Sequence, residues 1–291
     1  MSERDGTAGV AVHRRGGAAI FALALNTFRE AVRNKVLHSL LGFALVLIFA
    51  ALAVGQLSLG EETRVTRDIG LGGIGLFGVL IAIFVGVNLV YKEIQLKTVY
   101  AMLAKPVRRH EFILGKFAGM VLTLVLLIAV MALVLVIVLG VQGVQPDVAL
   151  AKALLLLVVE VVVVTAVAVM FSSFSTPFLS GAFTLGIYVV GRLQPELRGL
   201  QAKLAAATVA DGAAAAGNVI LRGVLTVLTT VFPDLHLFYV SGHEVAGKAV
   251  SVHGPTFVGW DYVAHATAYG LTYAAVMLLI AALIFRRRDF V

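Results

Sequence analysis

Glu160 is the residue whose setting most directly suggests chemistry, because it is a carboxyl in the middle of an apolar run, LLLLVVEVVVVTA. An acid at the centre of a bilayer costs about 2.5–3.5 kcal/mol, so such residues usually face a protein interior or a water-filled path. Two roles are therefore open: a polar contact in a solute route or at a dimer seam, or an internally hydrogen-bonded carboxyl that helps helices pack. Lys152 lies about two helical turns away and is not an ideal partner.

Two further patterns resemble catalytic sites but each lacks an essential part. The segment Gly242–Ala249, GHEVAGKA, resembles a phosphate-binding loop, yet Ala249 stands where the Mg²⁺-binding hydroxyl is required. Four histidines, with Asp234 and Glu244, offer metal-binding atoms, but their spacing matches no compact site. Because the chain has no cysteine, it has no thiol nucleophile and no cysteine metal site. We expect no catalytic residue and no bound metal. The histidines are His236, His243, His253 and His265.

The composition defines the class of protein that carries these residues. Apolar residues make up 60% of the 291 and charged residues 13%, and the mean hydropathy is +1.00. In soluble domains about 45–50% of the residues are apolar and about 25% are charged. A soluble protein of this size could not bury so much apolar surface in one core. The composition excludes a soluble enzyme, a disordered chain and a nucleic-acid-binding domain, and it indicates a polytopic membrane protein.

Six segments are expected to cross the membrane as helices, because a bilayer core about 30 Å thick requires about 20 apolar residues. The shortest begins at Pro177, which suits the first turn of a helix. The predicted fold class is therefore all-α integral membrane. The expected spans are residues 36–57, 70–91, 117–141, 148–171, 177–193 and 263–285.

The remaining segments are expected to lie at or outside the membrane surface. Residues 1–17 are predicted to be a flexible cytoplasmic tail. Residues 18–35 are predicted to form an amphipathic interfacial helix, either with a further role or only as the start of the first span. Its apolar stripe consists of Phe21, Leu25, Phe28 and Val32.

The long segment 194–262 is predicted to be an outer region. Its apolar part, 218–232, is short, contains Arg222 and is followed by Pro233. We interpret it as a re-entrant or interfacial helix and not as a seventh span, because backbone at membrane depth is tolerated where protein covers it.

Two sets of small residues predict close contacts between helices. Gly78, Ala82 and Gly86 are spaced four apart in the second span, where packing within one subunit is the expected use. Gly115 and Gly119 form a second pair at the start of the third span.

The distribution of charge predicts the orientation. The N-terminal segment, the 92–116 loop, the 172–176 turn and the C-terminal tail hold fifteen of the 23 lysines and arginines but six of the 16 acids. Their net charge is +9, against −2 for the rest of the chain. Because cytoplasmic loops carry the excess of basic residues, both termini are predicted to be cytoplasmic, in the inner membrane. The N-terminal region has no signal-peptide pattern.

The 92–116 loop, KEIQLKTVYAMLAKPVRRHEFILGK, predicts a basic helix, a proline turn and a second helix. Residues 92–104 would continue the second span, Lys105 is biased away from helix by Pro106, and a new helix would begin near Arg109. A rigid elbow of this kind suits contact with a docked partner. The alternative is a solvated loop whose charges only fix the topology.

This loop resembles the corresponding loop of type-2 ABC transporter permeases, the exporter-type membrane subunits. The segment FREAVRNK (28–35) also resembles the interfacial helix of that family, and FPDLHLF (232–238) its proline-containing segment before the last span. The resemblance covers nearly the whole chain. The loop residues that carry it are Glu93, Thr98, Leu103, Pro106, Arg109, Glu111, Gly115 and Lys116.

The resemblance implies that the loop holds a coupling helix that sits in a groove of a separate cytoplasmic ABC ATPase. It implies two ATPase copies that bind ATP and Mg²⁺, a second permease copy or a similar chain, and no cofactor on this chain. An outer accessory protein is a further candidate partner. The coupling residues it implies are Glu93, Thr98, Pro106, Arg109, Glu111, Gly115 and Lys116.

The expected function is thus that of the permease subunit of an ATP-driven exporter. One alternative keeps the fold but passes a conformational signal to an outer partner. An ion-coupled secondary transporter is disfavoured because we find no paired internal repeat. A membrane enzyme would need a convergent set of residues that the histidine spacing does not provide. The sequence leaves the substrate open.

Overall fold

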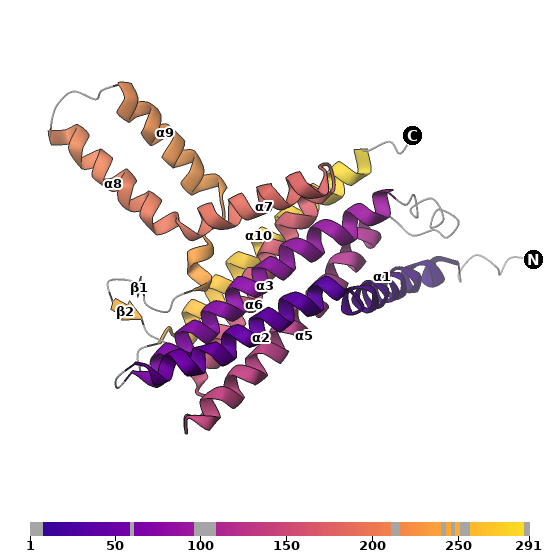
Figure 1. Ribbon diagram of the computed structural model, residues 1–291. Helices are drawn as coiled ribbons and strands as arrows, with labels where there is room; N and C mark the ends of the chain where they lie inside the picture. The colour runs from indigo at the N-terminus through magenta and orange to yellow at the C-terminus, as the bar shows by residue number, and fades with distance from the viewer. Residues whose placement is uncertain are drawn as a thin grey trace, which may run out of the picture.

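The computed structural model describes residues 8–58, 61–95, 109–210, 216–239, 243–245, 248–250 and 257–287. For residues 8–16, 89–95, 109–110, 206–210, 216–219, 243–245, 248–250 and 285–287 it describes the backbone alone. Long helices dominate this part of the chain (Figure 1). They are α1 (Ala8–Val32), α2 (Lys35–Gln56), α3 (Glu62–Gln95), α5 (Arg109–Val141), α6 (Val148–Ser172), α7 (Pro177–Arg192), α8 (Gln194–Ala210), α9 (Ala216–Val231), the 3-10 helix η1 (Leu235–Phe238) and α10 (Trp260–Arg287).

Five of these helices are long and apolar enough to cross a membrane: α2, α3, α5, α6 and α10. Their membrane-length parts agree with five of the predicted spans, and the all-α membrane class is confirmed. The helix α7 coincides with the remaining predicted span but has 16 residues. At 1.5 Å per residue it is about 24 Å long, shorter than the hydrocarbon core.

The helices α3 and α6 form the centre of the bundle, because most of their membrane-length residues are buried, whereas α2 and α10 are largely exposed. Small residues bring α3 and α6 together, as the spacing of Gly78 and Gly86 predicts. A Cβ atom on Gly86 would lie 2.6 Å from the Ala168 Cβ, and one on Gly78 would lie 3.2 Å from Val161. This stripe therefore serves packing within one subunit.

The elements of the bundle begin and end at two opposite ends (Figure 1). The α1 end holds α1, the last turn of α3, the first turn of α5, the turn between α6 and α7, and the end of α10. The hairpin end holds the turn between α2 and α3, the connection between α5 and α6, and the α8–α9 hairpin. This grouping matches the two sides that the charge distribution separates.

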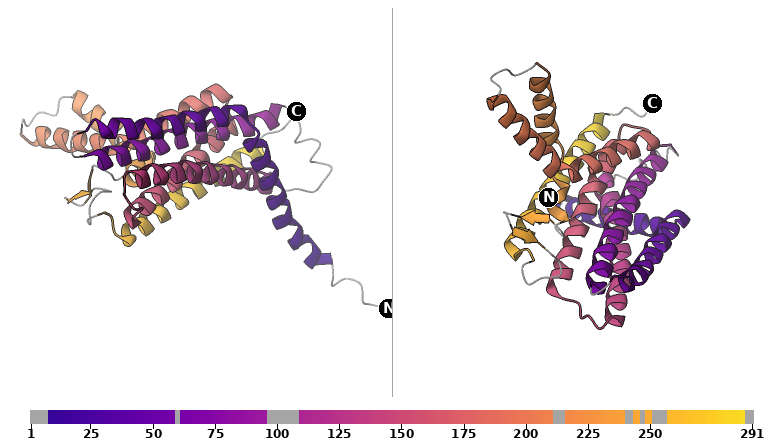
Figure 2. Two further views of the ribbon diagram at one scale, coloured as in Figure 1. Left: turned by 60° about the horizontal axis from the view of Figure 1, so that its bottom comes forward. Right: turned by 60° about the vertical axis from the view of Figure 1, so that its left-hand side comes forward.

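The helix α1 is distinct from α2 and leaves the bundle at a steep angle (Figure 2). The break falls at Asn34, whose side chain accepts a hydrogen bond from the Val36 N–H and caps α2. The structure extends the predicted 18–35 helix back to Ala8. The apolar stripe is not the packing face: Phe21 is 70% exposed, and Leu25 and Phe28 are half-buried. Among the described side chains of α1, the buried ones are those of Thr27 and Ala31.

At the hairpin end, α8 and α9 project away from the bundle (Figures 1 and 2). The chain then returns inward through η1, which packs between α6, α7 and α10. A Cβ atom on Gly191 of α7 would lie 2.7 Å from the Pro233 carbonyl oxygen, and one on Gly270 of α10 would lie 2.9 Å from the Phe238 ring. These glycines make room for η1 and the residues before it, so protein covers the backbone that leads into η1.

The segment that resembles a phosphate-binding loop adopts a different structure. His243–Val245 (β1) and Lys248–Val250 (β2) pair as antiparallel strands, with His243 opposite Val250. A phosphate-binding loop requires a helix directly after its lysine, whereas Lys248 begins a strand. The resemblance is therefore one of sequence alone.

A buried polar cluster as the candidate functional site

Glu160 forms an ion pair with Arg192 inside the bundle. The carboxyl group is fully buried, and Arg192 Nη2 lies 3.0 Å from its oxygens. The partner follows from topology: α6 and α7 are antiparallel about a short turn, and the two residues lie at comparable distances from that turn. The sequence does not indicate this pairing, because 32 residues separate Glu160 from Arg192. Lys152 instead donates a hydrogen bond to the Val258 carbonyl, 2.9 Å away, and lies over the Trp260 ring.

Two tyrosines complete what we call the Glu160 cluster, which consists of Glu160, Arg192, Tyr188 and Tyr239. The Arg192 guanidinium carbon lies 5.5 Å from the Tyr188 ring centroid and 4.7 Å from that of Tyr239. Both distances allow cation–π attraction. The cluster thus surrounds one cation with one carboxylate and two aromatic faces.

Two glycines of α3 lie beside this cluster, at distances where a Cβ atom would make ordinary van der Waals contact. A Cβ atom on Gly72 would lie 3.7 Å from the Tyr239 hydroxyl, and one on Gly75 would lie 4.0 Å from Arg192 Nη2. The Arg192 side chain stays 21% exposed, and its Nε atom has no hydrogen-bond partner among the described residues. The Arg192 side chain thus keeps an exposed edge, whereas its unpartnered Nε atom lies in the buried part of the cluster.

The Glu160 cluster lies deep in the bundle. Glu160 follows the first residue of α6, Val148, by twelve positions, which corresponds to about 18 Å along the helix. Since α7 ends at Arg192, this helix stops at the same depth. Ionisable residues at such depth are rare and usually mark a solute or proton path or an internal ion pair.

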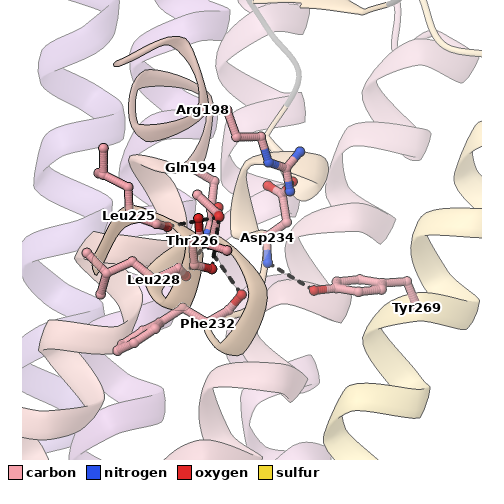
Figure 3. Close-up of polar contacts among 9 residues, drawn as sticks. Gln194, Arg198, Leu225, Thr226, Leu228, Phe232, Asp234 and Tyr269 are labelled. Carbon is pink, nitrogen blue, oxygen red and sulfur yellow. Dashed lines mark hydrogen bonds and ion pairs between the residues drawn. The ribbon is translucent and has the colours of Figure 1, made fainter. Parts of the chain in front are cut away.

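Polar contacts also fix the base of the α8–α9 hairpin, directly after Arg192 (Figure 3). The Gln194 amide donates to the Leu228 carbonyl at 3.2 Å and to the Phe232 carbonyl at 3.5 Å. Arg198 pairs with Asp234 at 2.8 Å, and the Asp234 N–H donates to the Tyr269 hydroxyl at 3.0 Å. These contacts link α8, the end of α9 and α10. The sequence analysis missed them, because the residues come from three separate segments.

The residues implied in coupling lie at the α1 end where the structure describes them. Glu93 is on the last turns of α3, and Arg109 begins α5, as predicted. Glu111, Gly115 and Lys116 follow on α5. Thr98, Leu103 and Pro106 lie outside the described residues.

Lys116 is 1% exposed, and its Nζ atom lies 3.8 Å from a Glu30 carboxyl oxygen. Its Nζ atom also lies 5.9 Å from the Phe112 ring centroid. Lys116, at this end of the 92–116 loop, is thus packed into the protein and is not a solvated lysine.

The four histidines do not converge in the part of the chain that the structure describes. His236 is in η1, and His265 is in α10 with Nδ1 2.7 Å from the Asp261 carbonyl oxygen. His243 begins β1, and His253 lies outside the described residues. Within the described ranges, no three His, Cys, Asp or Glu side chains are grouped as a metal would need.

A multi-pass helical bundle with an ion pair deep inside it is a common feature of membrane transport proteins. The family described as ABC-2 family transporter protein matches residues 21–290, and the chain therefore belongs to that family. The resemblance to type-2 ABC permeases is thus confirmed. The chain is a membrane permease of an ABC transporter, a class that works in the membrane with an ABC ATPase and is generally not itself catalytic. A search of curated proteins finds none that matches the chain.

Proposed function

We propose that this permease exports its substrate, driven by ATP hydrolysis on a separate cytoplasmic ATPase. The observation that carries the proposal is the α1 end, where the implied coupling residues Glu111, Gly115 and Lys116 belong to a helix packed tightly on α1. Force applied to the 92–116 loop would act directly on this packed interface. ATP and Mg²⁺ would bind to the ATPase, and this chain would bind no cofactor.

We further propose six membrane crossings with both termini in the cytoplasm of the inner membrane. The short helix α7 would enter from the cytoplasmic side and end at Arg192, and the re-entrant α8–α9 hairpin and η1 would complete that crossing. The 1–17 tail, the interfacial helix and the outer region would then take the places that the charge distribution predicts. The excess of basic residues at the α1 end supports this orientation.

The Glu160 cluster is our candidate for a polar position on the substrate path or at the seam between two permease copies. A homodimer, or a pair with a similar chain, would enclose the path, and two ATPases would bind below it. The exposed edge of Arg192 supports this assignment, because a fully structural ion pair needs no access.

Co-purification is the first test of the proposal. The tagged permease should retain an ATPase of about 25–35 kDa with a phosphate-binding loop, as the family resemblance implies. Reversing both charges, Arg109→Glu with Glu111→Arg, should uncouple ATP hydrolysis from the permease without unfolding it. Reversing the exposed Arg64–Glu61 pair at the hairpin end is the matched control and should leave coupling intact. An active permease without an ATPase would contradict the proposal.

A topology experiment tests the orientation. A reporter fused after Val291 should be cytoplasmic, and one inserted near Gly212 should be external. The reverse pattern would overturn the proposed orientation.

The projecting α8–α9 hairpin favours one second candidate, in which ATP hydrolysis sends a conformational signal to an outer protein. Deleting residues 199–227 should then abolish capture of that protein while ATP hydrolysis stays coupled. For an exporter without such a partner, no protein would be lost from the complex.

A further inference from the structure

The first turns of α5 and the second half of α1 contact each other closely. A Cβ atom on Gly115 would lie 2.7 Å from the Leu23 Cβ and 3.1 Å from the Ile20 carbonyl oxygen. One on Gly119 would lie 2.7 Å from the Thr27 Cβ and would overlap the Ala24 carbonyl oxygen. Only hydrogen fits at either position, so the backbones of the two helices touch here.

An ion pair lies beside this contact. Lys116 and Glu30 place their charged atoms 3.8 Å apart, with Lys116 almost fully buried and Glu30 28% exposed. Burying a charge is costly unless it is paired, so this geometry depends on α1 staying in register with α5. The pair thus joins the segments FREAVRNK and HEFILGK, which 74 residues separate in the sequence.

The face of α1 that meets α5 is not its conspicuous apolar stripe. Thr27 is fully buried and Ala31 is 1% exposed, whereas Phe21 points away. The Thr27 hydroxyl donates back to the Leu23 carbonyl at 2.9 Å, so this polar side chain is satisfied within α1. The α1 backbone, the Cβ atoms of Leu23 and Thr27, and the glycines of α5 thus form the close contact between these helices.

The position of this contact links the 92–116 loop to the first span. The contact begins six residues after the start of α5 at Arg109, and α1 continues through Asn34 directly into α2. Close-packed interfaces have few voids and transmit displacement, whereas loosely packed ones absorb it. A shift of the loop would therefore move α1 and, through it, α2.

We propose that Gly115, Gly119, Lys116 and Glu30 form a transmission joint, which carries displacement of the coupling loop from α5 through α1 to α2. These are positioning residues and contact no substrate. The inference rests on the proposed coupling to an ATPase and adds the route by which the coupling reaches the first span. A proposed route between two sites needs evidence that they are energetically coupled, and contact alone does not provide it. A cysteine introduced at the far end of α2 allows this coupling to be measured.

The measurement uses a single cysteine at Leu57, which is 83% exposed at the far end of α2. Because the protein has no native cysteine, Leu57→Cys is the only thiol. In the complex with its ATPase, ATP should change the labelling rate of this thiol by about fivefold or more, the lower range of typical allosteric coupling. The probe is a membrane-impermeant maleimide.

In this background, Gly119→Val should abolish the ATP response and Gly119→Ala should reduce it, with the ATPase still bound. Gly140→Val is the matched control on the same helix, because a Cβ atom there meets nothing within 4 Å. It should leave the ATP response unchanged. Monodisperse elution and an unchanged ATPase-to-permease ratio would show that each variant folds.

Exchanging the charges of Glu30 and Lys116 tests the joint without adding a side chain at the glycines. Glu30→Lys and Lys116→Glu should each suppress the ATP response, and the double variant should restore at least half of it. A full ATP response in Gly119→Val, or a double variant that responds no better than the single variants, would contradict the transmission joint. It would leave the proposed coupling to the ATPase unaffected. Lack of any ATP response with Leu57→Cys alone, together with no bound ATPase, would overturn both the joint and the proposed function.

Discussion

At the α1 end two helices touch backbone to backbone, whereas at the hairpin end α8 and α9 are held to the bundle largely by polar side chains at their base. Glycines make the first contact insensitive to side-chain rotation. The attachment of the hairpin depends on hydrogen bonds from Gln194 and on the Arg198–Asp234 ion pair. The two ends therefore differ in stiffness: the α1 end is suited to pass on motion, and the hairpin end is suited to swing. The Glu160 cluster lies next to the base of the hairpin, since Arg192 precedes Gln194 by two residues.

The largest expected effect comes from the Glu160–Arg192 pair. Arg192→Ala would leave a buried carboxylate without its cation, which typically costs about 3–5 kcal/mol, and should strongly lower the thermal unfolding temperature. Glu160→Ala should cost less, because Arg192 is partly exposed and can reach water. Unfolding can be followed by fluorescence in detergent.

The double variant Glu160→Leu with Arg192→Met separates stability from function. Replacing both members of a buried pair by apolar residues is often neutral or stabilising by about 1–4 kcal/mol, so the fold should recover. Transport should not recover if the pair lies on the substrate path. Full transport activity in this variant would show that the Glu160–Arg192 pair only helps the helices pack and is not on the substrate path.

A smaller effect is expected from Arg198→Ala. The Arg198 side chain is 55% exposed, so its ion pair with Asp234 should contribute about 1 kcal/mol or less. Backbone amides of α9 should then exchange up to about fivefold faster, since every 1.4 kcal/mol corresponds to a factor of ten. Exchange within α3 and α6 should not change.

Gln201→Ala is the control for this experiment, because it removes only an exposed hydrogen bond to Thr226 within the hairpin. If both variants raise exchange equally, the attachment at the base is not what limits the motion of α9.

A further effect, no smaller than that of Arg198→Ala, concerns Asp147, which is also at the hairpin end but pairs with the buried Arg67 of the bundle. Its carboxyl accepts from the Leu150 N–H and from Arg67 Nη1, both at 2.9 Å. Asp147→Ala should cost about 1 kcal/mol for the lost helix cap, together with the ion pair. Asp147→Asn keeps a capping oxygen, so the difference between the two variants isolates the cap.

The pH dependence of this effect has a definite sign. Burial raises the pKa of Asp147, but the Leu150 N–H and the Arg67 guanidinium outweigh it and lower the pKa below its ordinary value of 3.8. The stabilisation is therefore fully present above that value and is lost as pH falls through the lowered pKa. Thermal unfolding of the wild type and Asp147→Asn should differ by a constant amount between pH 5 and 8. A difference that varies within this range would contradict the assignment.

The spans were predictable because an apolar run of membrane length has few other uses. The start of α5 at Arg109 was also predictable, since Pro106 bars a continuous helix. The partner of Glu160 was harder to predict, because Arg192 is 32 residues away and becomes adjacent only when α6 and α7 pair. The close approach at Gly115 and Gly119 was predictable from the spacing of these glycines, but its partner was not. Apolar periodicity selects α1 residues such as Phe21, which faces outward, whereas Thr27 and the α1 backbone meet α5.

The shortness of α7 has a consequence for the surrounding bilayer. A helix of about 24 Å in a hydrocarbon layer of about 30 Å creates a mismatch on one flank of the protein. The bilayer there must become thinner, or the hairpin must take the place of some lipid. Thinning costs a fraction of a kcal/mol for each ångström of mismatch. The protein is therefore expected to favour thin membranes, and the elastic energy of its annular lipids would become part of the work of each transport cycle.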